Sequence, residues 1–135
     1  MPWQDKVPKS DTSIEKDLDE MVTALGFRPE KLKDGIPVEH PRIKRLYPDS
    51  VVYVEDKDGF GMLKKVLLAD GHLWHNRKLS QDLDTKRKDE LYVAAGWYVI
   101  HVGDFWFSNE KRKAELRPQL GRALVSRVAV IDLAN

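Results

Sequence analysis

The sequence predicts a mixed α/β fold in which helices flank a mixed β-sheet. An amphipathic helix comes first, with apolar residues at helical spacing from Ile14 to Leu25. A hairpin of two apolar strands follows, at about residues 50–54 and 61–69. A second helix at 82–95 stops at Gly96, and residues 97–102 then form a strand. Helices and strands in this order are typical of helices packed on a sheet.

The composition is that of a globular protein and excludes several classes. The chain has 135 residues, which fits about one domain, with 41% hydrophobic and 33% charged residues. The net charge is +1, so nucleic-acid binding would depend on local basic patches. The absence of cysteine excludes disulfides, thiolate nucleophiles and cysteine-ligated zinc. Because no apolar run approaches a membrane span and the first residues do not form a signal peptide, we expect a cytoplasmic protein.

The beginning of the chain predicts an arm and then a capped helix. Residues 1–10 contain prolines and several charges, so we expect an N-terminal arm, followed by a single domain over 11–135. Thr12 and Glu15 have the spacing of a capping box, which predicts a helix that begins at Thr12 and ends at Gly26. Glu15 therefore has two interpretations: it caps this helix, or its carboxylate belongs to a site.

Residues 28–48 predict a long irregular connection with a short strand at 36–38. Three basic residues, Arg42, Lys44 and Arg45, precede Tyr47. A basic cluster beside an aromatic residue suits contact with a phosphate backbone, and a solvated loop is the competing interpretation.

The predicted hairpin brings two carboxylates together. Asp49 precedes the first strand and Asp70 follows the second, so antiparallel pairing places both at the open end. Two neighbouring carboxylates repel each other unless a cation or a proton lies between them. Oxygen ligands of this kind suit Mg²⁺. The alternative for Asp70 is a turn-capping role in the Asp70-Gly71 pair.

The last third of the chain predicts further helices. Phe105, Trp106 and Phe107 form an aromatic cluster, after which Ser108 or Asn109 can cap a helix from 110 to about 117. Pro118 suits the start of another helical stretch, from 119 to about 128. Residues 128–131 fit either a helix end or a short strand.

Taken together, these segments resemble the very-short-patch repair (Vsr-like) endonucleases, a branch of the PD-(D/E)XK nuclease superfamily. The resemblance covers most of residues 11–103 and implies a restriction-endonuclease-like core. The same Glu, Asp, His and Asp set defines the EDxHD homing endonucleases, many of which are associated with phages. The matching segments are residues 11–16 with Gly26-Phe27, Pro48-Asp49, residues 70–75, and Asp84, Arg87 and Leu91 with Gly96-Trp97.

The resemblance implies a DNA endonuclease that depends on Mg²⁺ or Mn²⁺ and hydrolyses phosphodiester bonds in duplex DNA. Asp49 would be the main metal ligand, helped by a backbone carbonyl near Ala69, and Asp70 would be a second ligand. His75 would act as the base, since an unperturbed histidine pKa of about 6.5 suits proton transfer near neutral pH. Asp84 would orient His75, and Glu15 would hold a water molecule of the metal.

The resemblance also implies the DNA contacts. The aromatic residue at Trp74 would enter the base stack, although a core position is the alternative. Without the other motifs, His75 would be a surface histidine. For Lys86, Arg87 and Lys88, a solvated helix face is the alternative to phosphate binding. The residues expected to bind DNA are Trp74, Arg42, Lys44, Arg45, Lys86, Arg87 and Lys88.

Two departures from the family favour the compact homing type. Mismatch-repair members carry a structural zinc and a long insertion after the histidine, whereas this chain has no cysteine and a short segment from His75 to Asp84. The stretch from Asp49 to Asp70 is longer than in the family by a hairpin extension. A mismatch-repair nicking enzyme and a non-catalytic DNA-binding module on the same fold remain alternatives, and so does a small structural protein. The oligomeric state does not follow from the sequence.

Overall fold

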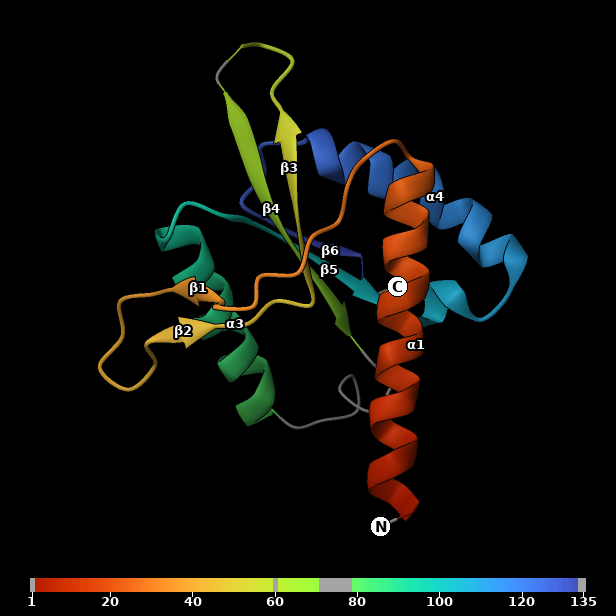
Figure 1. Ribbon diagram of the computed structural model, residues 1–135, viewed down its shortest axis with the longest axis horizontal. Helices are drawn as coiled ribbons and strands as arrows, with labels where there is room; N and C mark the ends of the chain where they lie inside the picture. The colour runs from red at the N-terminus through yellow and green to blue at the C-terminus, as the bar shows by residue number, and fades with distance from the viewer. Residues whose placement is uncertain (1, 60, 71–78, 134–135) are drawn as a thin grey trace.

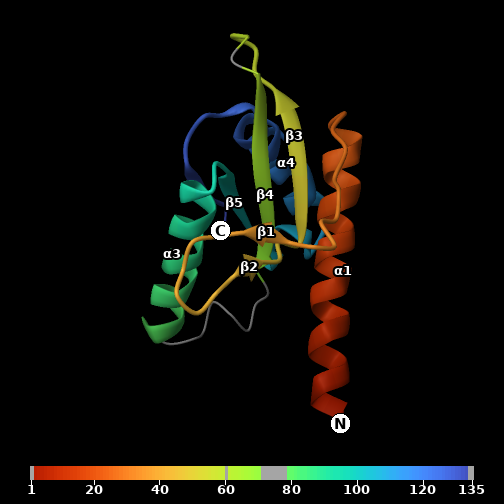
Figure 2. The ribbon, with the colours of Figure 1, turned by 60° about the vertical axis from the view of Figure 1, so that its left-hand side comes forward.

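In a computed structural model, the backbone is described for residues 2–59, 61–70 and 79–133, with side chains in these ranges except at 2–12, 70 and 79–85. A four-stranded sheet lies in the middle (Figure 1). Figure 2 shows α1 (Pro2–Ala24) on one side of it and α3 (Leu79–Ala94) on the other. Helix α4 (Glu110–Val125) packs on the same face as α1. The predicted class, a mixed sheet flanked by helices, is confirmed.

The sheet combines one hairpin with two parallel crossovers. Its strand order is β3-β4-β5-β6, where β3 (Ser50–Glu55) and β4 (Met62–Asp70) form the predicted antiparallel hairpin. Strand β5 (Tyr98–Gly103) is parallel to β4, and β6 (Val130–Leu133) is parallel to β5. Parallel neighbours need a crossover connection, and α3 and α4 supply these two crossovers. The sequence left residues 128–131 open between a helix end and a short strand, and the structure places Val130 and Ile131 in β6.

A second, two-stranded sheet interrupts the segment that was predicted to be irregular. Strand β1 (Ile36–Pro37) agrees with the expected short strand, and it pairs with β2 (Arg45–Leu46), which the sequence analysis missed. Strands of two residues have too little alternation to be recognised. Ile36 and Leu46 are buried with Tyr92 of α3 and Trp97, so this small sheet extends the core on the α3 face.

The larger core lies on the opposite face of the sheet. Helices α1 and α4 bury apolar stripes there, including Leu18, Val22, Leu120 and Leu124, against residues of β3, β4 and β5. None of the helices in the described ranges combines the length and the apolar character that crossing a membrane requires.

The predicted start of the first helix is wrong. Helix α1 begins at Pro2, so Thr12 lies inside it and residues 2–10, predicted to be an arm, belong to the helix. The spacing that suggested a capping box also occurs inside helices, where residues three apart share a face. Proline at the first helical turn is compatible with a start at Pro2.

The predicted break at Pro118 is also wrong. Helix α4 continues through Pro118, because Leu116, Leu120 and Leu124 form one buried stripe on both sides of it. The helix begins as expected at Asn109, whose Oδ1 accepts the Arg112 amide at 2.9 Å. The aromatic cluster forms a 3₁₀ turn, η1 (Asp104–Phe107).

Candidate functional site

Asp49 lies at the open end of the β3–β4 hairpin, as the sequence predicts. The register pairs Ser50 with Leu67, which brings Asp49 level with the last residues of β4. The Asp49 carboxylate is partly buried, and its Oδ2 accepts the Ala69 amide at 2.7 Å. The resemblance implied a metal-binding role for a backbone carbonyl near Ala69, whereas the contact between Asp49 and Ala69 in the structure is made by the Ala69 N–H. The side chain of Asp70 lies outside the described residues, and so does the predicted proximity of the Asp49 and Asp70 carboxylates.

A polar network joins this end of the hairpin to α1. The Ser50 hydroxyl donates to Asp19 Oδ1 at 2.6 Å. Lys31 Nζ lies 3.2 Å from Asp19 Oδ2 and donates to Ser50 Oγ at 2.9 Å and to the Asp49 carbonyl at 2.5 Å. Sequence reasoning missed Asp19, Lys31 and Ser50, because no motif connects three residues that are so far apart in the chain.

Glu15 lies on α1 about one turn before Asp19, and its side chain is partly buried. Residues three or four apart on a helix share a face, so Glu15 and Asp19 point in similar directions. Both belong to a groove beside α1. The residues that line this groove are Glu15, Lys16, Asp19, Glu20, Thr23 and Lys31.

A buried hydrogen-bonded pair of polar side chains lies between α3 and β5 on the other side of the hairpin end. His101 Nε2 lies 2.8 and 2.9 Å from the two carboxylate oxygens of Asp89. Both residues are at least nine-tenths buried. The sequence analysis missed this pair, although a histidine inside the apolar strand 97–102 is a signal, since a buried imidazole needs a polar partner.

Tyr92 of α3 lies near both carboxylates. Burial raises the pKa of the Tyr92 phenol above its usual value, and the nearby charges of Asp49 and Asp89 raise this pKa further. Tyr92 therefore stays protonated and neutral across the physiological pH range. The Asp49 carboxylate, which is bonded to β4, thus also acts electrostatically on a side chain of α3.

The side chains of four predicted site residues lie outside the described parts of the structure. Trp74 and His75 lie outside the described residues. The backbone of Asp84 belongs to α3, but its side chain is not described, and the same holds for Asp70 in β4. The structure thus brings the helix that carries Glu15 to the corner where Asp49 lies. The roles expected for His75 and Asp84 stay predictions.

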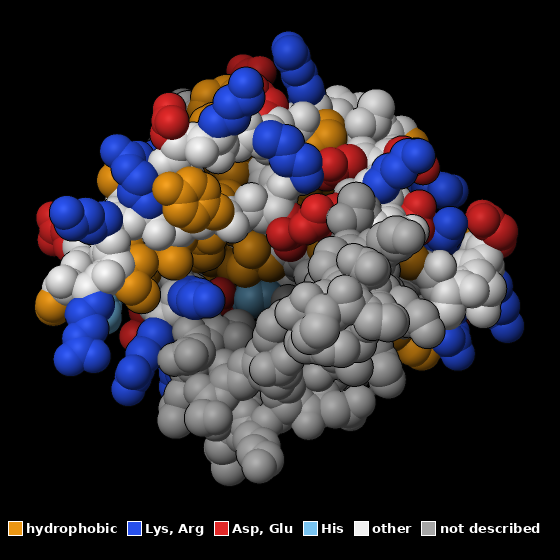
Figure 3. Space-filling view, turned by 60° about the horizontal axis from the view of Figure 1, so that its bottom comes forward, with side chains coloured by type: hydrophobic (Ala, Val, Ile, Leu, Met, Phe, Trp, Pro, Cys, Tyr) orange, Lys and Arg blue, Asp and Glu red, His pale blue; other side chains and the backbone are white. Residues whose placement is uncertain are grey.

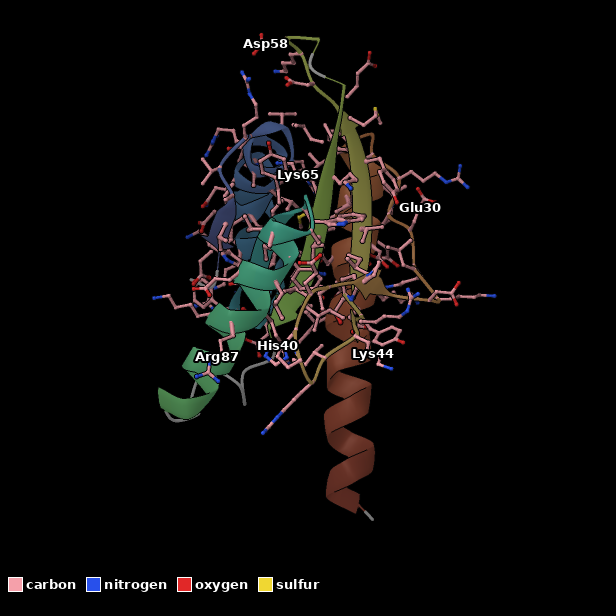
Figure 4. All side chains as sticks on the ribbon, turned by 90° about the vertical axis from the view of Figure 1, so that its left-hand side faces the viewer. Glu30, His40, Lys44, Asp58, Lys65 and Arg87 are labelled. Carbon is pink, nitrogen blue, oxygen red and sulfur yellow. The ribbon has the colours of Figure 1, made fainter. Side chains whose placement is uncertain are left out.

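The predicted basic residues are all exposed and come from two segments. Arg42, Lys44 and Arg45 lie in or beside the β1–β2 connection, and Lys86, Arg87 and Lys88 lie on α3. Figure 4 shows Lys44, His40 and Arg87 at the same level, toward the end where β4 terminates. His40 Nδ1 accepts the amides of Arg42 and Ile43 at 3.0 and 3.2 Å, which holds the turn of this connection.

Figure 3 looks onto this end of the molecule. Acidic side chains lie beside hydrophobic ones near the middle of the view, and both basic and acidic side chains lie around them on the described part of this face.

Within the side chains that are described, no group of three or more histidine or acidic residues is close enough to hold a metal ion. The hydrogen bond between Asp49 and the Ala69 amide uses Oδ2 of the carboxylate and not Oδ1. Compared with known proteins, the chain matches no family model, no curated protein and no solved structure.

Proposed function

We propose that this chain is a metal-dependent endonuclease that hydrolyses phosphodiester bonds in duplex DNA, similar to the EDxHD homing endonucleases. One observation carries the proposal: the Asp49 carboxylate lies at the end of β4, bonded to the Ala69 amide, at the corner to which α1 is tied. Helix α1 carries Glu15, the other described member of the Glu, Asp, His and Asp set. Support for the proposal is that α1, which carries Glu15, is bonded through Asp19 to the strand end next to Asp49.

The donor chemistry at this corner suits Mg²⁺ or Mn²⁺. Mg²⁺ is commonly held by one or two carboxylates together with water, and Asp49 keeps an oxygen for this purpose. When bound, such a cation offsets negative charge that develops on the scissile phosphate. A second ligand would come from Asp70. Without cysteine, a cysteine-ligated structural zinc is not expected.

The chain's own side chains supply the remaining roles in this proposal. His75 accepts a proton from the attacking water, and Asp84 fixes the orientation of the imidazole. Glu15 would hold a water molecule of the metal, and Trp74 would enter the base stack. The exposed basic residues of the β1–β2 connection and α3 bind phosphates on either side, which makes affinity fall with salt concentration.

Plasmid cleavage with Mg²⁺ or Mn²⁺ tests this function, and Asp49→Asn is the decisive variant. The amide oxygen of asparagine still accepts the Ala69 N–H, so the fold persists while the negative charge disappears. We expect cleavage to fall by at least about a hundredfold, roughly 2.7 kcal/mol in barrier. Asp34→Asn, at an exposed position, is the matched control and should cleave like the unmodified protein.

Gel shifts in EDTA separate the alternatives. DNA binding without cleavage by the unmodified protein would indicate a non-catalytic binding module, and neither binding nor cleavage would indicate a structural protein. A duplex with one T:G mismatch tests the mismatch-repair alternative, which requires nicking only of that duplex. Full cleavage by Asp49→Asn would contradict the assignment of Asp49.

A further inference from the structure

We infer that Lys31 is a positioning residue, which sets the place of Asp49 relative to α1. Its ammonium reaches the backbone carbonyl of Asp49, the hydroxyl of Ser50 and the carboxylate of Asp19. Lys31 therefore joins the start of β3 to α1 by hydrogen bonds and by an ion pair. The consequence for catalysis rests on the proposed nuclease function, whereas the positioning itself does not.

The backbone around Lys31 anchors it beside β3. Its neighbour Glu30 exchanges two hydrogen bonds with Val51: the Glu30 amide donates to the Val51 carbonyl at 2.8 Å, and the Val51 amide donates to the Glu30 carbonyl at 2.9 Å. This bridge fixes the segment on the outer edge of β3. Lys31 then lies next to Ser50, within reach of α1, before the chain continues toward β1.

The network restrains Asp49 from two directions. Lys31 and Ser50 hold the backbone at the start of β3, and the Ala69 amide holds the end of the Asp49 side chain. Through Asp19, the same lysine fixes this corner against the helix that carries Glu15. Charge-assisted hydrogen bonds are shorter and stronger than neutral ones, so several of them from one ammonium restrain the positions of the groups that they join.

The exposure of Lys31 argues that positioning, and not stability, is its main effect. More than half of its side-chain surface is accessible, and Asp19 is one-quarter exposed. Ion pairs in such surroundings contribute little to the free energy of unfolding. A small displacement of a catalytic group, in contrast, can slow a reaction by orders of magnitude. Loss of Lys31 should therefore change the site far more than it changes the fold.

The test uses the full chain with Lys31→Met, Lys31→Arg and the control Lys33→Met, which removes one exposed charge nearby. Amide hydrogen exchange is followed by NMR without metal. In Lys31→Met we expect the Ala69 amide to exchange at least about tenfold faster, because its acceptor Asp49 is no longer held. The Val66 amide, in the middle of β4, should keep its rate, and Lys31→Arg should restore much of the Ala69 protection.

Single-turnover cleavage of plasmid DNA with Mg²⁺ is the second measurement. We expect the rate of Lys31→Met to fall at least about tenfold, with the thermal unfolding midpoint unchanged and with Lys33→Met like the unmodified protein. Equal acceleration at Ala69 and Val66 would indicate a merely structural role and overturn the inference. Unchanged Ala69 exchange would also overturn it.

The two measurements also separate this inference from the proposed function. If the unmodified protein does not cleave DNA, the nuclease proposal fails, and the exchange rates alone still decide the role of Lys31. If exchange at Ala69 changes and the cleavage rate of an active enzyme does not, the link between Lys31 and catalysis is overturned.

Discussion

Glu15 lies on the face of α1 that also carries Asp19, and it has no capping role because α1 begins at Pro2. This removes the structural explanation that competed with a role in a site. We predict that Glu15→Gln leaves the free energy of unfolding nearly unchanged, since the amide has the same shape and remains on the helix surface. The cleavage rate should fall at least about tenfold, or ~1.4 kcal/mol in barrier.

The control for Glu15→Gln is Glu115→Gln, an exposed position on α4 that lies outside the groove. It removes one negative charge without touching the candidate site. Both variants are compared by denaturant unfolding and by single-turnover cleavage at saturating Mg²⁺. Equal rates for the two variants would show that the carboxylate of Glu15 takes no part in the reaction.

At the scale of elements, hydrophobic period predicted the main helices and the strands of the larger sheet near residues 50–54, 61–69 and 97–102. It did not predict that α1 begins at Pro2, that α4 continues through Pro118 or that β2 forms. The antiparallel hairpin follows from the apolar runs around Gly59, and its register is what places Asp49 beside Ala69. The pairing of β4 with β5 was not predictable in the same way. Parallel pairing depends on how α3 packs, and no local signal records it.

The difference between local pairing and tertiary packing also explains which site residues could be predicted from the sequence. Asp49 was predictable because a hairpin is local, whereas the Lys31, Asp19 and Ser50 network joins three elements that meet only in the folded chain. The pair Asp89 and His101 likewise depends on the docking of α3 against β5. Residues brought together by tertiary packing have no spacing rule, so sequence reasoning could not assign them.

Pro118 provides a prediction at the scale of one element. It lies inside α4 with an exposed side chain, and without an N–H it cannot donate to the carbonyl one turn earlier, at Ala114. Replacement by alanine restores this donor and raises helix propensity, although it also gives the unfolded chain more freedom. We predict that Pro118→Ala raises the free energy of unfolding by about 1–2 kcal/mol, as measured by urea-induced unfolding.

Arg117→Ala is the control for Pro118→Ala, because it changes an exposed neighbour with similar helix propensity and leaves the backbone donor in place. Its free energy of unfolding should stay within about 0.5 kcal/mol of the unmodified protein. A loss of stability in Pro118→Ala would show that the proline is needed to shape α4.

At the scale of the whole molecule, Lys65 connects the sheet to the end of α4. Its side chain extends from β4 into the interior and is fully buried. Figure 4 shows Lys65 between the sheet and α4. Its Nζ donates to the Ser126 carbonyl at the C-terminus of α4 and lies 4.3 Å from the centre of the Tyr98 ring. Burial lowers the pKa of Lys65 from 10.5 to about 8.

This buried charge makes the stability of the protein depend on pH. Between pH 8 and 10.5 the unfolded chain keeps the Lys65 proton while the folded chain loses it, so the free energy of unfolding rises with pH through this window. The rise is at most about 3 kcal/mol. Above pH 10 the raised pKa of Tyr92 acts in the opposite direction, because the unfolded phenol ionises first.

We therefore predict that Lys65→Met removes the rise in stability between pH 7.5 and 9.5, because methionine fills a similar volume without a proton to lose. At pH 7 the variant avoids the cost of burying an ammonium, which raises its stability, but it loses the hydrogen bond to Ser126, which lowers it. The slope of its free energy of unfolding against pH is therefore more informative than its stability at one pH. Urea unfolding at several pH values measures this slope. Lys57→Met, in the exposed turn between β3 and β4, should keep the rise. If Lys65→Met showed the same slope as the unmodified protein, another titrating group would have to be responsible.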